Sequence, residues 1–197
     1  TSIPFWVNQH IWFSKESKNL RKKFNFKEEA FLIGSFQRDT EGSDLISPKL
    51  SKGPDQLLEI ITEMIKDKSN LEVVLTGKRR NYLINNFKKL GIPFHYFEMV
   101  DFDMINNLYN CLDLYIVSSR FEGGPQSVVE CGLTKTPIIS TRVGIAEEIL
   151  PGKSLFDMDN FKNAKPDVDF AYNKSLQYTI PEGFKEFRNL FSRLNEI

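Results

Sequence analysis

Residues 119–132 read SRFEGGPQSVVECG and combine two carboxylates with two glycines and a proline. Pro125 suits the first position of a helix, so the two glycines before it are expected at a helix N-terminus. Free amides and the positive end of the helix dipole bind anions there, and residues without side chains let a phosphate approach. Glu122 would repel phosphate and suits sugar hydroxyls. Glu130, about two turns into the helix, could accept hydrogen bonds from a ribose diol.

Two cations near the start of the chain could complete an anion site. Lys52 directly precedes Gly53 and Pro54 and a predicted helix, where its ammonium group could reach a diphosphate. Arg38 lies in the segment after the first predicted strand, which ends at Gly34. A lysine before a helix is commonly solvated, so a surface role for Lys52 is an equal alternative. Glu130 could likewise be an ordinary solvated helix residue, although the preceding Gly-Gly-Pro favours function.

The elements that must position these residues alternate between strands and helices. Apolar runs predict strands at 31–35, 71–77, 92–100, 113–119 and 136–141, and helical spacing predicts helices at 55–67, 82–91, 103–111, 124–133 and 144–152. Nearly continuous apolar strands alternating with helices indicate a parallel sheet covered on both faces. The handedness of crossovers then predicts a doubly wound, Rossmann-like α/β fold. Ligands bind such sheets at the carboxyl ends of the strands, where the residues above collect.

Three segments differ in character. Residues 1–30 are aromatic and then basic without a clear period, which indicates a linker or a lead-in strand and loop. Residues 31–156 carry the alternating pattern and form the predicted binding domain. Residues 157–197 begin as a polar loop at 157–170 and end in an amphipathic helix that we expect to pack back on the domain or a hinge. The chain has no initiator Met and reads as a piece of a longer protein.

Composition excludes several classes of protein. The 197 residues carry 26 basic and 26 acidic side chains, so no basic excess exists to bind nucleic acid. No apolar run is long enough for a transmembrane helix. Cys111 and Cys131 fall in predicted helices and suit small buried side chains in a reducing compartment. His10 and His95 lie far apart without ligand spacing, so a zinc site or histidine-based catalysis is disfavoured.

Three Asp-x-Asp patterns, at 101–103, 157–159 and 167–169, could suggest a metal-dependent transferase. The first is better explained as a helix cap, and the other two lie in polar segments. We therefore expect no metal.

The motifs resemble the donor-binding half of retaining GT-B glycosyltransferases, in particular glycosyltransferase family 4. The family's hallmark is two glutamates in an E-x7-E arrangement after a strand that ends in serine, here Glu122 and Glu130. A Lys-Gly pair before a helix, here Lys52 and Gly53, is a second family feature. The runs LYNCLDLYIVSS and TPIIST follow the family's order, and the resemblance covers about residues 31–156.

The resemblance implies roles for these residues. Glu122 would lie against the donor sugar as the catalytic residue, and Glu130 would hold the nucleotide ribose. Further donor-binding groups would come from the main chain, from polar side chains and from the cations: Gly34, Arg38, Lys52, Gly123, Gly124, Gln126 and Ser127. Family members place an arginine directly after the strand glycine, where this chain has Ser35, so Arg38 is the candidate replacement. The resemblance places base contacts near Met99 and Val100.

The implied reaction transfers a sugar, such as a hexose, from a UDP- or GDP-sugar to a glycan or lipid-linked acceptor with retained configuration. It needs no metal or other cofactor. The acceptor would bind to the protein's own N-terminal domain, so we expect the isolated chain to be inactive. Polysaccharide or lipopolysaccharide synthesis, in the cytoplasm or peripherally at a membrane that the basic run at 15–27 contacts, is the expected context. The alternatives are a non-catalytic nucleotide-binding module and a sugar-nucleotide epimerase of the same architecture.

Overall fold

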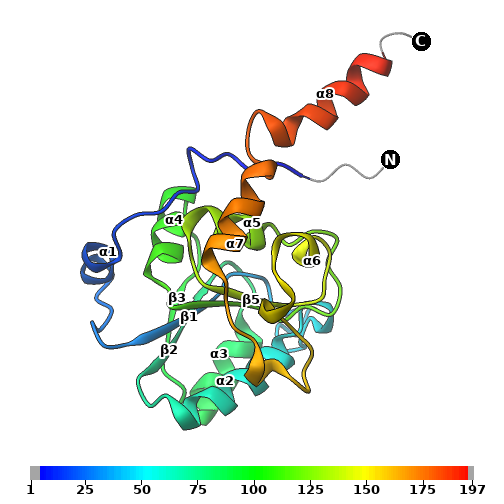
Figure 1. The fold of residues 1–197 in the computed structure, drawn as a ribbon. Coiled ribbons are helices and arrows are strands. Elements are labelled where there is room, and N and C mark those ends of the chain that lie inside the picture. Colours follow the sequence, from blue (N-terminus) through cyan, green and yellow to red (C-terminus); the bar gives the residue numbers. More distant parts are fainter. Residues whose placement is uncertain (1–4, 195–197) are drawn as a thin grey trace.

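A computed structural model describes residues 5–194 and shows a six-stranded sheet in which every pairing is parallel. The strand order is β3-β2-β1-β4-β5-β6 (Figure 1). The strands are β1 (Phe31–Ser35), β2 (Leu71–Thr76), β3 (Phe94–Phe97), β4 (Leu114–Val117), β5 (Ile138–Thr141) and β6 (Leu155–Phe156). This confirms the predicted doubly wound α/β fold, because the order reverses direction between β1 and β4.

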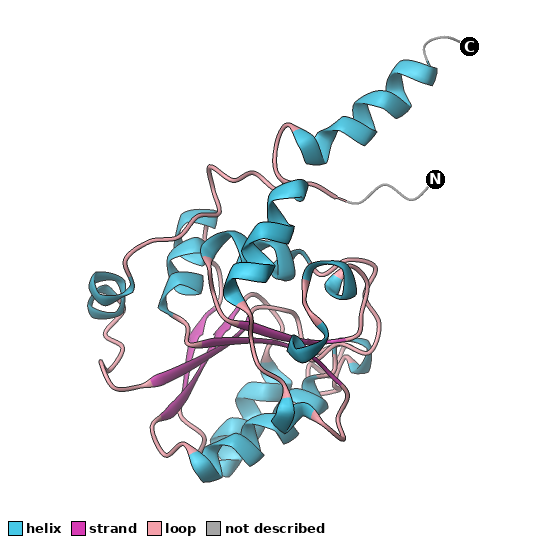
Figure 2. Cartoon of the chain, in the orientation of Figure 1, coloured by secondary structure: helices cyan, strands magenta, loops and turns pink. Residues whose placement is uncertain are grey.

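Helices cover both faces of the sheet (Figure 2). One face is covered by α2 (Pro54–Asp67) and α3 (Asn81–Leu90), and the other by α4 (Phe102–Cys111), α5 (Gln126–Thr134), α6 (Ala146–Ile149) and α7 (Val168–Ser175). Each layer encloses its own cluster of buried apolar side chains. Short 3-10 turns lie at Leu50–Lys52, Gly152–Ser154, Phe161–Asn163 and Leu176–Tyr178.

Local sequence explains where these elements begin and end. All six residues of β2 are buried, as expected for the centre of a covered parallel sheet. Gly91, in the left-handed conformation, ends α3 as predicted. Asp101 caps α4 by accepting a hydrogen bond of 2.8 Å from the Met104 amide, which confirms the predicted cap. The strand expected at 92–100 and the helix expected at 144–152 are shorter than predicted. Both cysteines are buried and unpaired in α4 and α5.

The N-terminal segment contains more structure than a linker. Helix α1 (Ser17–Lys23) lies beside α4, and the residues before it run along α4 (Figure 1). The backbone of this segment is held by buried α4 asparagines: Asn106 accepts from the Phe13 amide, and Asn110 accepts from the Lys15 amide. Farther upstream, the Val7 amide donates to the Tyr178 carbonyl at 2.8 Å. The first four residues lie outside the described part of the chain.

The C-terminal segment splits into two parts. Helix α7 begins inside the stretch predicted as loop, capped by Asp167, and packs on α5 so closely that a Cβ on Gly132 would lie 2.0 Å from the Ser175 hydroxyl. Helix α8 (Glu182–Leu194) instead stands away from the body (Figure 1). Its described contacts include the edge of the Phe184 ring against Trp6. Within residues 5–194, no helix is both long and apolar enough to cross a membrane. The end of the predicted helix at 195–197 lies outside the described residues.

Candidate functional site

A cavity of about 470 Å³ opens between the carboxyl ends of β1 and β4 and the start of α5. Most of the residues predicted from the sequence line it: Lys52, Glu122, Gly124, Gln126, Ser127 and Glu130. They come from the loops after β1 and β4 and from the first turns of α5. This is the place where a doubly wound sheet binds its ligand, since the loops diverge there.

The loop that carries Lys52 is fixed against the end of β4. Gly53 has a φ of +59°, and a Cβ on it would lie 1.8 Å from the Ser118 carbonyl oxygen. The Ser118 hydroxyl donates to the Gly53 carbonyl at 2.9 Å, and the Ser51 carbonyl accepts from the amides of Arg120 and Phe121. Glycine is therefore required at position 53 for both the backbone conformation and the close approach.

We expect Gly53→Ala to destabilise the fold by about 1–3 kcal/mol, because a side chain in this conformation is strained and the Cβ would overlap backbone. Gly77→Ala is the matched control, since Gly77 has a φ of +85° and a Cβ added there would meet no atom within 4 Å. Urea unfolding of both variants measures the difference. Equal losses would show that the contact with Ser118 contributes nothing.

Glu122 and Lys52 form an ion pair inside the cavity, with side chains only 11% and 26% exposed. The Ser119 hydroxyl lies 3.0 Å from the same carboxylate oxygen and 3.1 Å from Oε1 of Gln37. The Gln37 amide nitrogen in turn donates to the Lys52 carbonyl at 2.8 Å. The ammonium and the carboxylate thus neutralise one another. An incoming diphosphate would compete for the Lys52 ammonium and free Glu122 for sugar hydroxyls.

Glu130 accepts a hydrogen bond of 2.7 Å from the Tyr109 hydroxyl at the other side of the cavity. Removal from water raises the pKa of the Glu130 carboxyl to about 7, against the smaller lowering by the Tyr109 hydroxyl. Burial and the neighbouring Glu130 together raise the pKa of Tyr109 well above its usual value, so this phenol stays a hydrogen-bond donor. The Glu130 carboxyl can therefore gain or lose its proton near neutral pH, which is unusual for a glutamate.

The start of α5 offers unpaired amides to the cavity. Helix α5 begins at Gln126, two residues into the predicted range of 124–133, because Pro125 has an extended ψ of 107° and serves as the N-cap residue instead of the first helical residue. Among the described residues, the amides of Gln126 and Ser127 have no backbone acceptor. A Cβ on Gly123 would meet nothing within 4 Å, so its backbone is open to a ligand. Gly123 lines an adjoining open hollow on the far side of Glu122.

Two predicted site residues lie apart from the cavity. Gly34 is buried within β1, where a Cβ would lie 2.2 Å from a Leu112 methyl group, so its need for glycine comes from packing. The exposed Arg38 donates to the Thr40 carbonyl at 2.8 Å and does not line the cavity. Ser35 is buried, with its hydroxyl unpaired among the described atoms.

Sequence reasoning missed the group that anchors the loop after β1. Arg80 is fully buried and donates to Asp39 at 2.6 Å, to the Ser35 carbonyl at 2.6 Å and to the Thr76 carbonyl at 2.8 Å. These bonds join the ends of β1 and β2 to the loop that leads to Lys52. The two charged residues are 41 positions apart in sequence, so no local pattern pointed to them. Aromatic cavity residues such as Trp12 and Tyr109 were missed for the same reason.

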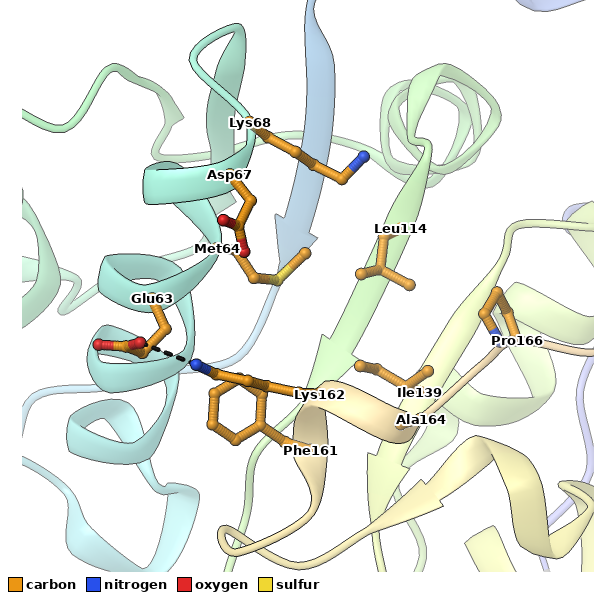
Figure 3. Close-up of a pocket in the computed structure, with 10 residues that line it drawn as sticks. All are labelled: Glu63, Met64, Asp67, Lys68, Leu114, Ile139, Phe161, Lys162, Ala164 and Pro166. Atoms are coloured by element: carbon orange, nitrogen blue, oxygen red, sulfur yellow. Dashed lines mark hydrogen bonds and ion pairs between the residues drawn. The ribbon is translucent and has the colours of Figure 1, made fainter.

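A second hollow, of about 220 Å³, lies at the opposite end of the sheet (Figure 3). It is mainly apolar, with Met64, Leu114 and Ile139 in its wall, and the ion pair of Lys162 with Glu63 lies at its edge. None of the predicted site residues lines it. In the part of the chain that the structure describes, no group of three or more His, Cys, Asp or Glu side chains is arranged to hold a metal ion.

Comparisons with known proteins concern the family and the fold. Residues 45–164 match the family model described as "Glycosyl transferases group 1". No curated protein sequence matches the chain significantly.

Solved structures share the fold at low sequence identity. Sucrose-phosphate synthase from Thermosynechococcus elongatus has a TM-score of 0.77 and 12% identity, over 98% of this chain and 52% of that one. The C-terminal domain of the group 1 family protein LpcC from Francisella tularensis has a TM-score of 0.70 and 17% identity, over 88% of this chain and 99% of that domain. Anabaena HepE, solved in complex with UDP-glucose, has a TM-score of 0.71 and 18% identity, over 95% of this chain and 56% of that one. The chain thus spans about half the length of the first and third of these proteins.

Proposed function

The chain belongs to the group 1 glycosyl transferases, and we propose that it is the half of a retaining family 4 enzyme that binds the nucleotide-sugar donor. The observation that carries the proposal is the single cavity that brings together Glu122, Glu130, Lys52 and the start of α5. These groups match the parts of a sugar nucleotide: a diphosphate between a cation and free amides, a ribose at one carboxylate and a sugar at the other. Anabaena HepE, which shares the fold, is solved with UDP-glucose.

In the proposed reaction the donor sugar passes to a hydroxyl of a glycan or lipid-linked acceptor. The acceptor oxygen bonds to the anomeric carbon as the bond from that carbon to the diphosphate breaks, and the acceptor proton passes to the leaving phosphate oxygen. The Lys52 ammonium and the amides at the start of α5 stabilise the charge that develops on that oxygen. Glu122 orients the sugar by accepting hydrogen bonds from its hydroxyls, while Glu130 holds the ribose. This scheme uses no metal ion or other cofactor.

We further propose that the acceptor binds to another domain of a longer enzyme, so that the isolated chain binds donor without transferring sugar. This division is supported by the length of the match, because the chain spans only about half of each of two matched structures. Polysaccharide or lipopolysaccharide synthesis in the cytoplasm, with peripheral contact to a membrane, is the proposed setting. The exposed Lys22 and Lys23 of α1 offer positive charge for such a contact.

Calorimetric titration of the 197-residue chain with UDP, GDP and UDP-glucose tests the donor-binding proposal. We expect Lys52→Met to weaken UDP binding by about 1.5–3 kcal/mol, the range for a charged hydrogen bond, because it removes the cation and leaves Glu122 to repel the diphosphate. Lys162→Met is the matched control, since Lys162 also pairs with a glutamate but lies at the opposite hollow (Figure 3). Failure of wild type to bind any of these nucleotides would contradict the proposal.

A further inference from the structure

The hollow of about 220 Å³ at the amino ends of β4 and β5 has an apolar interior (Figure 3). On the side of the sheet it is lined by Leu114 and Ile139, which are 6% and 3% exposed. Phe161 and Met64 of α2 line its other sides. A space of this size can hold one ring or one short aliphatic group, since an apolar cavity of about 150 Å³ is known to bind benzene.

The hollow is formed in advance, because the segment at 161–166 that borders it is held at two points. Lys162 pairs with Glu63 of α2 at 3.0 Å, which ties the segment to the facing helix. The Lys165 carbonyl accepts a hydrogen bond of 2.7 Å from the fully buried Ser154 hydroxyl, which ties it to the body of the domain. A ligand can therefore enter without first ordering its own binding site, which would weaken its affinity.

The mouth of the hollow presents one positive and one negative charge. Glu63 and Lys162 neutralise one another, but Asp67 and Lys68, at the end of α2, form no ion pair with any residue of 5–194. The Lys68 ammonium lies 4.3 Å from the centre of the Phe31 ring, a contact that leaves it able to donate to an anion. Its side chain reaches across the hollow toward β4, whereas the Asp67 carboxylate stays beside α2 (Figure 3). An apolar interior with a few placed polar groups is the usual composition of a ligand site.

We propose that this hollow binds a small zwitterion with an apolar group, namely a free α-amino acid whose side chain is apolar. The side chain enters against Leu114 and Ile139, the carboxylate meets the Lys68 ammonium, and the ammonium group meets Asp67. An anion alone would be repelled by Asp67 and a cation alone by Lys68, so the complete zwitterion matches the mouth best. The hollow shares no lining residue with the cavity beside α5, so this inference does not rest on the proposed function.

NMR titration of the methyl signals of the 197-residue chain tests the proposal, with L-phenylalanine as the probe. We expect it to shift the signals of Met64, Leu114 and Ile139 with a Kd of about a millimolar, the range for a ligand of about 12 non-hydrogen atoms. The signals of Val128, which is buried in the other layer, should not move.

Three analogues separate the parts of the probe. Hydrocinnamate lacks the ammonium group and phenethylamine lacks the carboxylate, so each should bind about two- to fivefold more weakly than phenylalanine, the range for one exposed ion pair. Glycine has both charges but no side chain, so it should leave the methyl signals unchanged.

Two variants assign the charges to residues. Both side chains are exposed, so neither change disturbs the core. Lys68→Gln should weaken phenylalanine and hydrocinnamate by about two- to fivefold without weakening phenethylamine, and Asp67→Asn should weaken phenylalanine and phenethylamine without weakening hydrocinnamate. Lys89→Gln is the matched control, since Lys89 is also an exposed lysine at the end of a helix but lies outside the hollow. It should bind every probe as wild type does.

Three results would overturn the proposal. If phenylalanine at about tenfold the expected Kd shifts none of the three signals, the hollow is not a binding site. If the three probes that carry a ring bind equally well to wild type and to both charge variants, the hollow accepts any apolar molecule and the zwitterion is excluded. If glycine shifts the same signals as strongly as phenylalanine, the apolar interior takes no part in binding.

Discussion

Asp39→Ala is expected to lower the free energy of unfolding by about 3–5 kcal/mol, the range for removing one partner of a buried ion pair. The Arg80 guanidinium has no exposed surface and donates to Asp39 at 2.6 Å, so the variant leaves a buried positive charge without its counter-charge. The Thr40 hydroxyl, which donates to the other Asp39 oxygen at 2.6 Å, also loses its acceptor. Because small domains are stable by only about 5–15 kcal/mol, this loss is large. Urea unfolding measures it.

Two further variants compare the buried Asp39–Arg80 pair with a partly exposed ion pair and test the effect of removing both buried charges. Asp55→Ala removes the partner of Arg120, a bidentate pair whose side chains are 34% and 37% exposed, and should cost only about 0–1 kcal/mol. The double variant Asp39→Ala with Arg80→Met leaves no buried charge without a partner and should recover part of the loss, while the Ser35 and Thr76 carbonyls still lose their donor. A loss below about 1 kcal/mol for Asp39→Ala would show that water reaches Arg80.

Sequence patterns predicted the parts of this molecule that local physics determines. The alternation of apolar strands with amphipathic helices predicted the doubly wound sheet, and the glycines and proline before α5 located the start of that helix to within two residues. The spacing of the two glutamates predicted Glu122 in the loop before the helix and Glu130 within the helix, and both line one cavity in the structure. Such features depend on residues within a few positions of one another, where periodicity and capping act.

Contacts between distant segments could not be predicted in this way. Arg80 and Asp39 meet because β1 and β2 lie side by side, which no spacing in the sequence encodes. Trp12 enters the cavity only because Asn106 and Asn110 hold the N-terminal segment, although the asparagine-rich sequence of α4 could have signalled a polar contact. The short helix α7 has a cap at Asp167 that offered a signal, but its apolar periodicity is weak. Gly34 was interpreted as a binding residue although packing against Leu112 explains it.

Glu130→Gln is expected to stabilise the fold and to weaken nucleotide binding at the same time. The folded-state pKa of Glu130 is raised to about 7 by burial, whereas a carboxyl in an unfolded chain titrates near its ordinary value. The ionised carboxylate is therefore less favourable in the folded protein. Its cost is absent below the unfolded pKa, grows as pH rises toward the folded pKa and levels off above it at about 3 kcal/mol. Unfolding at pH 5 and pH 8 should show the advantage of Glu130→Gln increasing with pH.

In the proposed donor site, the same charge that destabilises the fold would hold the ribose. An ionised carboxylate accepts two hydrogen bonds from the diol, whereas the amide accepts with one oxygen only, so Glu130→Gln should weaken UDP-glucose binding at pH 8 by about 1–3 kcal/mol. Because the ligand prefers the ionised form, wild-type affinity should rise by about tenfold between pH 6 and pH 8 and that of the variant should stay level. UDP-glucose suits this measurement because esterification leaves its diphosphate without a group that titrates in this range.

Glu148→Gln provides the matched control for the loss of a tyrosine–carboxylate bond. Glu148 accepts from the Tyr178 hydroxyl at 3.0 Å, much as Glu130 accepts from Tyr109, but it lies outside the cavity. Its replacement should leave UDP-glucose affinity unchanged. If Glu130→Gln stabilises the fold at pH 8 yet binds UDP-glucose like wild type, the carboxylate is a buried group that does not meet the ribose. If it does both as expected, Glu130 is a residue at which stability is given up for binding, which is the behaviour of a functional site.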